Sequence, residues 1–355
     1  MTAEPRITRF QRSDEADAIG MLLGKLPPSE REKAYAARRS RWRWQYYDNP
    51  DNPDGEPLIW VARVDHSFGG MVATIPVKVR TPKGPVLGMW GVDFIVSNKM
   101  RGMGIGKSLL AEWIKTPGIA FVMGWSPVSF KVAKRVGFEV MWGFSTADIV
   151  LSRIGYTVAS VKKKQRTDLN RLARVFWHLN PRVKTGAGPG RPCSVQAALP
   201  KGAGRLWEEV SEHYTFAVER EETYLKWRFE DHPLYDYRFV CLGAPDDLEG
   251  LGICRLTGDN PPLGIVADLI ADPTSKEIIY GLTDAMVGYL GSQGAYAARM
   301  DLPPCLADPI LSRYRCSLRK DRGMIVRTED EDLRAAGILK ADAWYISRSD
   351  ADEDY

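Results

Sequence analysis

The residues best suited to chemistry stand in one glycine-rich stretch, Arg101-Gly-Met-Gly-Ile-Gly-Lys-Ser108. A strand-like segment ending at Val96 precedes it, and a segment with helical periodicity follows it. Glycines let the backbone turn tightly and bring several N–H groups to one point, at the positive end of the following helix. Because N–H groups arranged in this way suit a pyrophosphate, we interpret the stretch as a phosphate-binding loop.

Two common phosphate-binding loops do not fit this stretch. A dinucleotide fingerprint requires the spacing G-x-G-x-x-G, whereas the glycines here follow G-x-G-x-G. A Walker A loop requires a glycine five residues before Gly106-Lys107-Ser108, and Arg101 occupies that position. The spacing therefore argues against both a dinucleotide site and a nucleoside-triphosphatase site.

The string R-G-x-G-I-G, with Val96 five residues before Arg101, resembles the coenzyme A pyrophosphate loop of the GNAT (GCN5-related N-acetyltransferase) superfamily. Residues 126–138 resemble the helix that ends in the family's Gly-Phe step. The resemblance covers Arg6–Leu151 and is faint over Cys193–Tyr355. It implies acetyl-CoA or coenzyme A as co-substrate, with no metal. By the same resemblance, the coenzyme-binding residues are Phe94, Ile95, Val96, Arg101, Gly102, Met103, Gly104, Ile105, Gly106, Lys107 and Ser108.

The resemblance also implies how the reaction is arranged. The strand Asp93–Val96 is expected to splay from its neighbour and to bond the pantetheine arm, with one N–H polarising the thioester carbonyl. The amine must lose a proton, and Asp93 is the candidate catalytic base, although an aspartate bonded to loop backbone explains this residue equally well. The family often carries a tyrosine acid four residues before Gly137, but Ala133 stands there. The proton donor to the thiolate is therefore not identified.

The strands and helices expected around these residues form a mixed sheet flanked by helices, an α/β (α+β) fold. For the first half we expect strands at Ile7–Phe10, Leu58–Asp65, Gly69–Val79, Val86–Val96, Ile119–Gly124 and Phe138–Leu151, and helices at Ser13–Leu26, Ser29–Tyr47, Gly104–Lys115 and Ser126–Val136. For the second half we expect strands at Tyr237–Leu242, Gly250–Thr257, Gly264–Ala271, Tyr296–Leu302, Gly323–Arg327 and Ala343–Ser347, and helices at Ser275–Leu290 and Pro309–Lys320.

Two short echoes suggest that the second half is a duplicate of the first. The pattern W-x-aromatic-x-D-x-P occurs at Trp44–Pro50 and again at Trp227–Pro233. Val92–Val96 is likewise echoed by Ala267–Ala271. Chance resemblance of short strings is the alternative, but the echoes occur in the same order at similar offsets. We therefore expect two tandem GNAT-like domains.

The predicted domains are a coenzyme-binding domain at 1–152, a basic helix with a Gly/Pro linker at 153–192, and a degenerate domain at 193–355. At the position that corresponds to the glycine-rich loop, the degenerate domain has Pro273–Gly281. This segment contains a single glycine, so the degenerate domain should bind no coenzyme. We expect it to shape the acceptor pocket through Trp227, Asp231 and the acidic residues Asp350–Tyr355. The basic helix is either a solvated face or a surface for an anionic acceptor.

Composition excludes several classes of protein. A net charge of +4 over 355 residues does not favour nucleic acid as a partner. No apolar run is long enough for a membrane span, and no signal peptide is expected, so the cytoplasm is the expected compartment. The four histidines have no metal-ligand spacing. Composition leaves the oligomeric state open.

The leading functional hypothesis is therefore an acetyl-CoA-dependent N-acyltransferase acting on the amine of a small molecule, such as an amino sugar of a surface polysaccharide. One alternative is a protein or peptidoglycan-precursor acyltransferase, in which the basic helix docks a large anionic acceptor. The other is a non-catalytic coenzyme-A-binding module, which the missing tyrosine favours.

Overall fold

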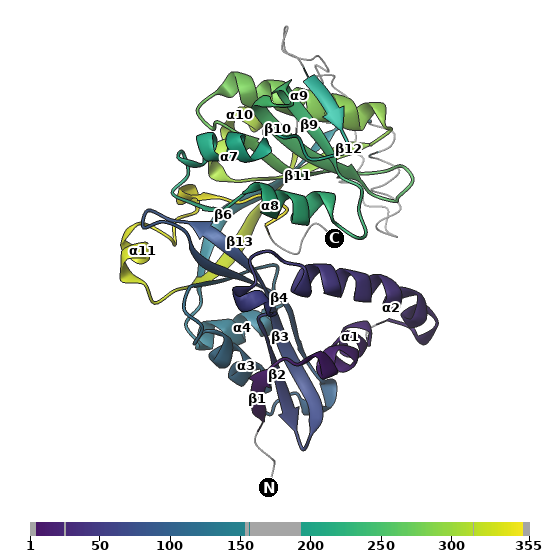
Figure 1. Cartoon of the computed structure of the whole chain (residues 1–355), viewed down its shortest axis with the longest axis vertical. Helices are drawn as coiled ribbons and strands as arrows, with labels where there is room; N and C mark the ends of the chain where they lie inside the picture. Colours follow the sequence, from purple (N-terminus) through teal and green to yellow (C-terminus); the bar gives the residue numbers. More distant parts are fainter. Residues whose placement is uncertain (1–4, 25, 153–155, 157–192, 315, 351–355) are drawn as a thin grey trace, which may run out of the picture.

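A computed structural model describes residues 5–24, 26–152, 156, 193–314 and 316–350. The predicted basic helix and Gly/Pro linker at 153–192 lie outside these residues, apart from Tyr156. The described chain forms one large mixed sheet with helices on both sides, which confirms the predicted α/β class. In Figure 1 the first half occupies the lower part of the molecule and most of the second half the upper part.

The first half matches the expected order of strands and helices, with boundaries shifted by a few residues. Its strands are β1 (Arg6–Arg9), β2 (Ile59–Val64), β3 (Ser67–Arg80), β4 (Val86–Val96), β5 (Ile119–Met123) and β6 (Glu139–Val150), and its helices are α1 (Glu15–Leu23), α2 (Pro28–Trp42), α3 (Ile105–Trp113) and α4 (Pro127–Arg135). A π-helical turn, Arg43–Tyr47, continues α2.

The second half repeats much of this order. Its strands are β7 (Cys193–Gln196), β8 (Phe216–Val218), β9 (Arg238–Ala244), β10 (Asp247–Leu256), β11 (Gly264–Ala271), β12 (Ala297–Leu302), β13 (Cys316–Arg327) and β14 (Trp344–Tyr345), and its helices are α7 (Ala203–Ser211), α8 (Glu222–Leu225), α9 (Lys276–Ser292), α10 (Pro304–Arg313) and α11 (Glu331–Ala335).

The prediction of a helix at Pro309–Lys320 was wrong at both ends. Helix α10 begins at Pro304, because a proline fits the first turn, where its missing N–H costs nothing. The segment from Cys316 onward is instead the first part of β13, paired with β6 from Cys316↔Ile149 to Arg319↔Thr146. Pairing with a neighbouring strand has overridden the local helical pattern there.

The two halves exchange strands at the centre of the sheet. The strand order is β1-β2-β3-β4-β5-β13-β6-β12-β11-β10-β9-β7. Strand β13 of the second half thus lies between β5 and β6 of the first, and β6 lies between β13 and β12 of the second. The two central strands run side by side in Figure 1. Each half therefore needs a strand of the other to complete its sheet.

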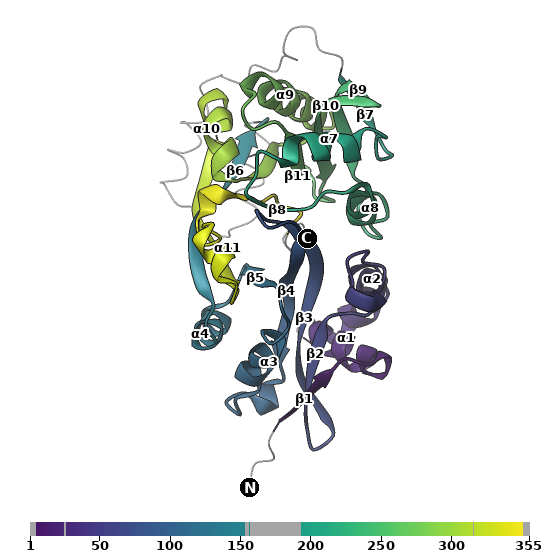
Figure 2. The same ribbon diagram turned by 60° about the vertical axis from the view of Figure 1, so that its left-hand side comes forward.

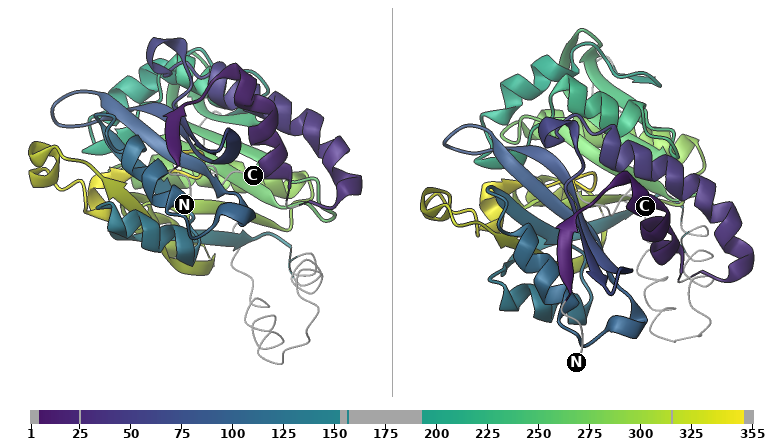
Figure 3. Two further views of the ribbon diagram at one scale, coloured as in Figure 1. Left: turned by 90° about the horizontal axis from the view of Figure 1, so that it is seen from below. Right: turned by 60° about the horizontal axis from the view of Figure 1, so that its bottom comes forward.

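The helices of the first half cover opposite faces of its strands. Along β2, Ile59 and Val61 pack in the cluster beneath α1 and α2, whereas Trp60 and Ala62 pack in the cluster beneath α3 and α4. This alternation follows the two-residue period of a strand. Figures 2 and 3 show α1 and α2 on one side of the strands and α3 and α4 on the other.

The echoed W-x-aromatic segments meet each other in the structure. Each lies in a π-helical turn, at Arg43–Tyr47 and at Lys226–Glu230. The Trp44 and Trp227 rings stack with centroids 5.0 Å apart. Each indole donates to the backbone carbonyl of the other tryptophan, at 2.7 Å from Trp44 and 2.9 Å from Trp227. The two echoed segments therefore bond each other reciprocally across the halves, which agrees with the expected duplication.

Trp44→Ala should therefore destabilise the whole chain. Trp44 is buried, and its replacement by alanine leaves a cavity, breaks the hydrogen bond from its indole to the Trp227 carbonyl, and removes the ring on which Trp227 stacks. We expect a loss of about 3–5 kcal/mol in the free energy of unfolding, measured by chemical denaturation. Tyr35→Ala on the exposed side of α2 is the control and should stay within about 0.5 kcal/mol of wild type. Equal, small losses in both variants would contradict the structural role.

Candidate coenzyme and acyl-transfer site

The glycine-rich loop lines a cavity of about 530 Å³. Its walls come from the end of β4, from the loop and first turn of α3, and from one side of α4. The predicted coenzyme residues in these walls are Phe94, Ile95, Val96, Arg101, Gly102, Gly104, Ile105, Gly106 and Lys107. Met103 instead packs against the core, and the Ser108 N–H donates to the Gly104 carbonyl at 3.1 Å.

The loop has the backbone geometry that a phosphate site needs. Gly102 and Gly104 have φ of 87° and 78°, a conformation that side chains disfavour. Gly104 is the N-cap of α3 and supplies no side-chain cap to the helix. The first-turn N–H groups of α3 therefore point into the cavity without a capping side chain, where they can bind an anion at the positive end of the helix.

The equivalent helix of the second half is closed to such an anion. Ser275 caps α9, and its hydroxyl accepts from the Ile278 N–H at 3.4 Å. The Asp272 carboxylate accepts from the Thr274 N–H at 2.7 Å. The Ser275 side chain thus already accepts from one first-turn N–H of α9, and a phosphate at this turn would meet the Asp272 carboxylate, which carries the same charge. This contrast supports the prediction that the second half binds no coenzyme.

Strand β4 splays from β5 as predicted. The two strands pair only from Gly88↔Ile119 to Trp90↔Phe121, whereas β4 stays paired with β3 up to Val96. The register on β3 shifts between Val72 and Thr74, opposite the β4 residues 91–94. Beyond Trp90, the β5-facing backbone groups of β4 are therefore free of ladder bonds to β5 and can bond the amides of a pantetheine arm.

Asp93 lies on the opposite face of β4 from the coenzyme cavity. Its carboxylate accepts from the Arg38 guanidinium on α2, and from the Tyr46 hydroxyl at 2.7 Å. The side chains of Arg38 and Asp93 are largely buried. Sequence reasoning did not identify Arg38 or Tyr46 as partners, although the echo had already singled out Tyr46 as its aromatic position.

Burial, and then the neighbouring Asp93 carboxylate, raise the pKa of Tyr46 well above its ordinary value. The tyrosine therefore stays protonated and continues to donate to Asp93 at any ordinary pH. Two donors hold the carboxylate in one orientation. An amine on this face of the sheet would reach a fixed acceptor, while a coenzyme bound in the cavity would occupy the other face. That division of faces fits a base for the attacking amine.

The side chain at position 133 is buried in the wall of a second, smaller cavity. Being an alanine, it has no proton to donate to a thiolate. Two hydroxyl groups lie nearby, because Ser129 is one turn and Ser126 two turns before Ala133. Both serines line both cavities. Their side chains form the reciprocal cap of α4, with the Ser129 N–H 3.1 Å from the Ser126 hydroxyl.

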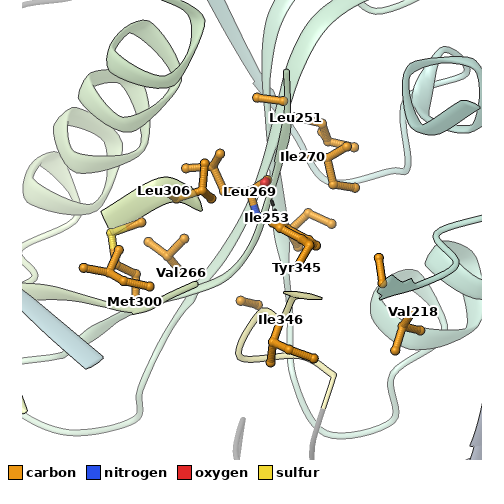
Figure 4. Close-up of a cluster of buried hydrophobic side chains, with 14 of the residues drawn as sticks. Val218, Leu251, Ile253, Val266, Leu269, Ile270, Met300, Leu306, Tyr345 and Ile346 are labelled. Carbon is orange, nitrogen blue, oxygen red and sulfur yellow. Dashed lines mark hydrogen bonds between the residues drawn. The ribbon is translucent and has the colours of Figure 1, made fainter. Parts of the chain in front are cut away.

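In the second half, a side chain of the protein occupies the gap that corresponds to the split between β4 and β5. Strand β11 pairs with β12 only at Gly264 and Ile265. Tyr345 lies against the opened part of β11, and its hydroxyl donates to the Leu269 carbonyl at 2.5 Å. Figure 4 shows Tyr345 beside Leu269 among packed apolar side chains.

Asp268, the echo of Asp93, is fully enclosed. Arg220 donates to Asp268 at 3.0 Å and to Asp350 at 2.8 Å, and none of these three side chains is exposed. The Tyr345 hydroxyl is 2.6 Å from Asp268. The residue that corresponds to Asp93 is therefore part of a buried charge network in the second half, so Asp268 is not a catalytic candidate.

The acceptor residues expected in the second half lie elsewhere, as far as the structure describes them. Trp227 is buried against Trp44, so its ring has no free face for a sugar. Asp231 ends the π-helical turn and pairs with Lys226 at 3.0 Å, and neither cavity is lined by it. The expectation that Asp350 helps to shape the acceptor pocket was wrong, because its carboxylate is buried against Arg220. Residues 351–355 lie outside the described part of the chain.

The fold is that of the GCN5-related N-acetyltransferases. The chain is similar to a GCN5-related N-acetyltransferase from Anabaena variabilis at 10% identity and a TM-score of 0.62, over 92% of this chain and 74% of the other. It is similar to one from Kribbella flavida at 12% identity and a TM-score of 0.58, over 93% and 72%. It also resembles Eis1 from Mycobacterium abscessus at 16% identity and a TM-score of 0.52, over 95% and 76%.

No family model matches the sequence, and no curated protein matches it significantly. In the part of the chain that the structure describes, no helix combines the length and apolarity needed to cross a bilayer. Across the same residues, the acidic, histidine and cysteine side chains form no group of three that could hold a metal ion.

Proposed function

We propose that the protein is an acyl-CoA-dependent N-acyltransferase that transfers an acyl group to the amine of a small molecule. The observation that carries the proposal is the uncapped first turn of α3, preceded by the loop Arg101–Gly104 and facing the split between β4 and β5. A pyrophosphate on those N–H groups and a pantetheine arm along β4 would use both features at once. The neighbours of this fold, named as acetyltransferases, support the same function.

The reaction we propose is a direct attack of the amine on the thioester. A backbone N–H of the splayed part of β4 stabilises the oxyanion of the tetrahedral intermediate. Asp93, fixed by Arg38 and Tyr46, accepts the proton of the amine. The thiolate leaves beside Ser129, whose hydroxyl can hydrogen-bond the sulfur in place of the absent tyrosine. The second half completes the sheet by placing β13 between β5 and β6.

Coenzyme A should bind at one site per chain. The first turn of α3 has no side-chain cap, whereas Ser275 caps α9 and the Asp272 carboxylate lies in the turn just before that helix. We expect calorimetry to give a stoichiometry near one, with loss of binding only on substitutions in the first half. Two equivalent sites would contradict the proposed division between the halves. Full-length protein is required, since the halves share strands β6 and β13.

Turnover tests the enzymatic function directly. Release of free thiol from acetyl-CoA should depend on an added primary amine, assayed over a panel of amino sugars, aminoglycosides, polyamines and amino acids. A small acceptor that supports turnover favours the proposal. Turnover only with a peptide or a peptidoglycan precursor supports the large-acceptor alternative. Coenzyme binding with no turnover for any acceptor would favour a binding module instead.

A further inference from the structure

Positive charge is concentrated in the segments on both sides of the coenzyme cavity. Between Phe94 and Phe138 the chain has seven lysine or arginine residues and a single carboxylate, Glu112. Lys115 pairs with Glu112 at 2.6 Å. No carboxylate of the described residues lies within ion-pair distance of the other six cations, which are Lys99, Arg101, Lys107, Lys131, Lys134 and Arg135. This region therefore carries a local excess of positive charge, in a chain whose net charge is only +4.

A bound coenzyme accounts for only part of this charge. Arg101, Lys107 and Arg135 line the cavity, where they can contact the phosphates of the coenzyme. Lys131 and Lys134 line neither the coenzyme cavity nor the smaller cavity beside it. Both are exposed to solvent on α4. These two lysines therefore need an explanation other than the coenzyme site.

The outer side of α4 is basic and partly apolar. Val128, Lys131, Lys134 and Arg135 recur at intervals of three or four residues, so they share one side of the helix. All four are exposed, Val128 to 73%. The helix contains no acidic residue, and Glu139, which follows it, pairs with Arg334 at 2.7 Å. We call these four residues the outer face of α4.

An aromatic surface continues the outer face of α4 toward β6. The Lys134 ammonium group lies 5.7 Å from the centroid of the Phe130 ring. Phe130 stacks on Trp125 with centroids 5.4 Å apart, and Trp142 meets Trp125 edge-on at 6.2 Å. Trp142 remains 54% exposed. Large apolar side chains exposed beside charged ones are typical of a surface that binds another macromolecule.

The charge and the position of this surface indicate the kind of partner. An acidic protein complements the lysines and can cover Val128 and Trp142. The outer face of α4 also borders the coenzyme cavity, since Val128 and Arg135 belong to the cavity wall as well. A protein docked there could insert a phosphopantetheine arm into that cavity. An anionic membrane would match the charge but has no such arm, so the observations favour an acidic carrier protein.

We propose that the outer face of α4 docks an acidic carrier protein, which presents the acyl group on its own phosphopantetheine arm. This inference rests on the proposed function and names the partner that supplies the acyl group. The phosphate of the arm binds at the first turn of α3, as a coenzyme phosphate would. The amine nitrogen bonds to the acyl carbonyl carbon, and the C–S bond breaks. Asp93 accepts the proton of the amine, and the sulfur takes a proton and leaves as the thiol of the arm.

The test is calorimetric titration of the full-length protein with a bacterial fatty-acid-type acyl carrier protein. The carrier is used in its acetylated form and in the form that lacks the arm, and coenzyme A is titrated separately. We expect the acetylated carrier to bind at least about tenfold more tightly than the form without the arm. Its binding should weaken as salt is raised, because the contact is between exposed charges.

Two double variants locate the contact. Lys131→Glu with Lys134→Glu should weaken binding of the acetylated carrier by about tenfold or more, because attraction becomes repulsion at both positions. The same variant should keep coenzyme A affinity within about threefold, since neither lysine lines the cavity. Lys201→Glu with Lys276→Glu makes the same change in net charge at two exposed lysines of the second half. This matched control should bind the carrier as wild type does.

The outcomes separate this inference from the proposed function. Binding of coenzyme A without binding of the acetylated carrier overturns the carrier inference and leaves the acyltransferase proposal standing. Failure of both to bind overturns both. Equal binding of the carrier with and without its arm, or equal losses in the two double variants, would show attraction between net charges alone and overturns the inference. Binding to anionic vesicles that requires Lys131 and Lys134, with no binding of the carrier, would assign this face to a membrane instead.

Discussion

Gly104→Glu should abolish coenzyme binding while the protein stays folded. Gly104 has a φ of 78° and is the N-cap of α3, where the backbone must come close to the phosphates. A side chain there blocks that approach, and a carboxylate repels the pyrophosphate. Losing even two charge-assisted hydrogen bonds of about 1.5–3 kcal/mol each weakens binding by roughly 100-fold or more. Calorimetry with coenzyme A measures the change.

A matched control separates backbone strain from loss of the site. Gly294 has a φ of 82° and, like Gly104, has open space for at least 4 Å around the position that a β-carbon would take. It follows α9 in the second half, far in sequence from the loop. Gly294→Glu therefore introduces the same residue in the same backbone conformation and should bind coenzyme A normally. Wild-type affinity in Gly104→Glu would mean that the phosphates bind elsewhere.

The loop and its strand could be predicted because their chemistry is local. The glycine spacing fixes the turn at Gly102 and Gly104, and the positive φ angles at both positions bear this out. The echo of Trp44 in Trp227 was also visible in the sequence. The stacking of one ring on the other was not, because it depends on how the two halves pack.

The long-range features left no local signal. Nothing in β13 indicates that it enters the first half's sheet between β5 and β6, since strand pairing depends on partners far away in sequence. Arg38 is 55 residues from Asp93, and its role is visible only once α2 packs over β4. The expected acceptor role of Trp227 rested on its aromatic ring and on the packing expected for two tandem halves. Its position is instead decided by burial between the halves.

Asp93→Asn should slow acyl transfer by roughly 10²–10⁴-fold, the range typical for loss of a general base. An asparagine keeps the size of the side chain but cannot accept the amine's proton. The loss should shrink as pH rises, because a larger fraction of the free amine is then already neutral. Tyr46 stays protonated as the pH rises, because burial raises its pKa. The hydrogen bond that it donates to position 93 therefore does not change with pH. The measurement is kcat/KM against pH for an established acceptor.

A structural role for Asp93 predicts a different pattern, because its carboxylate also anchors Arg38 of α2. Arg38→Gln removes that anchor and keeps the carboxylate with its Tyr46 hydrogen bond. If Asp93 is the base, Arg38→Gln should retain much more activity than Asp93→Asn, and its loss should not shrink at high pH. Asp268→Asn makes the same substitution at the buried echo position, so it should lower stability while the shape of the pH profile stays that of wild type. Equal losses in the two variants of the first half at every pH would show that Asp93 holds α2 in place, and that the proton of the amine leaves by another route.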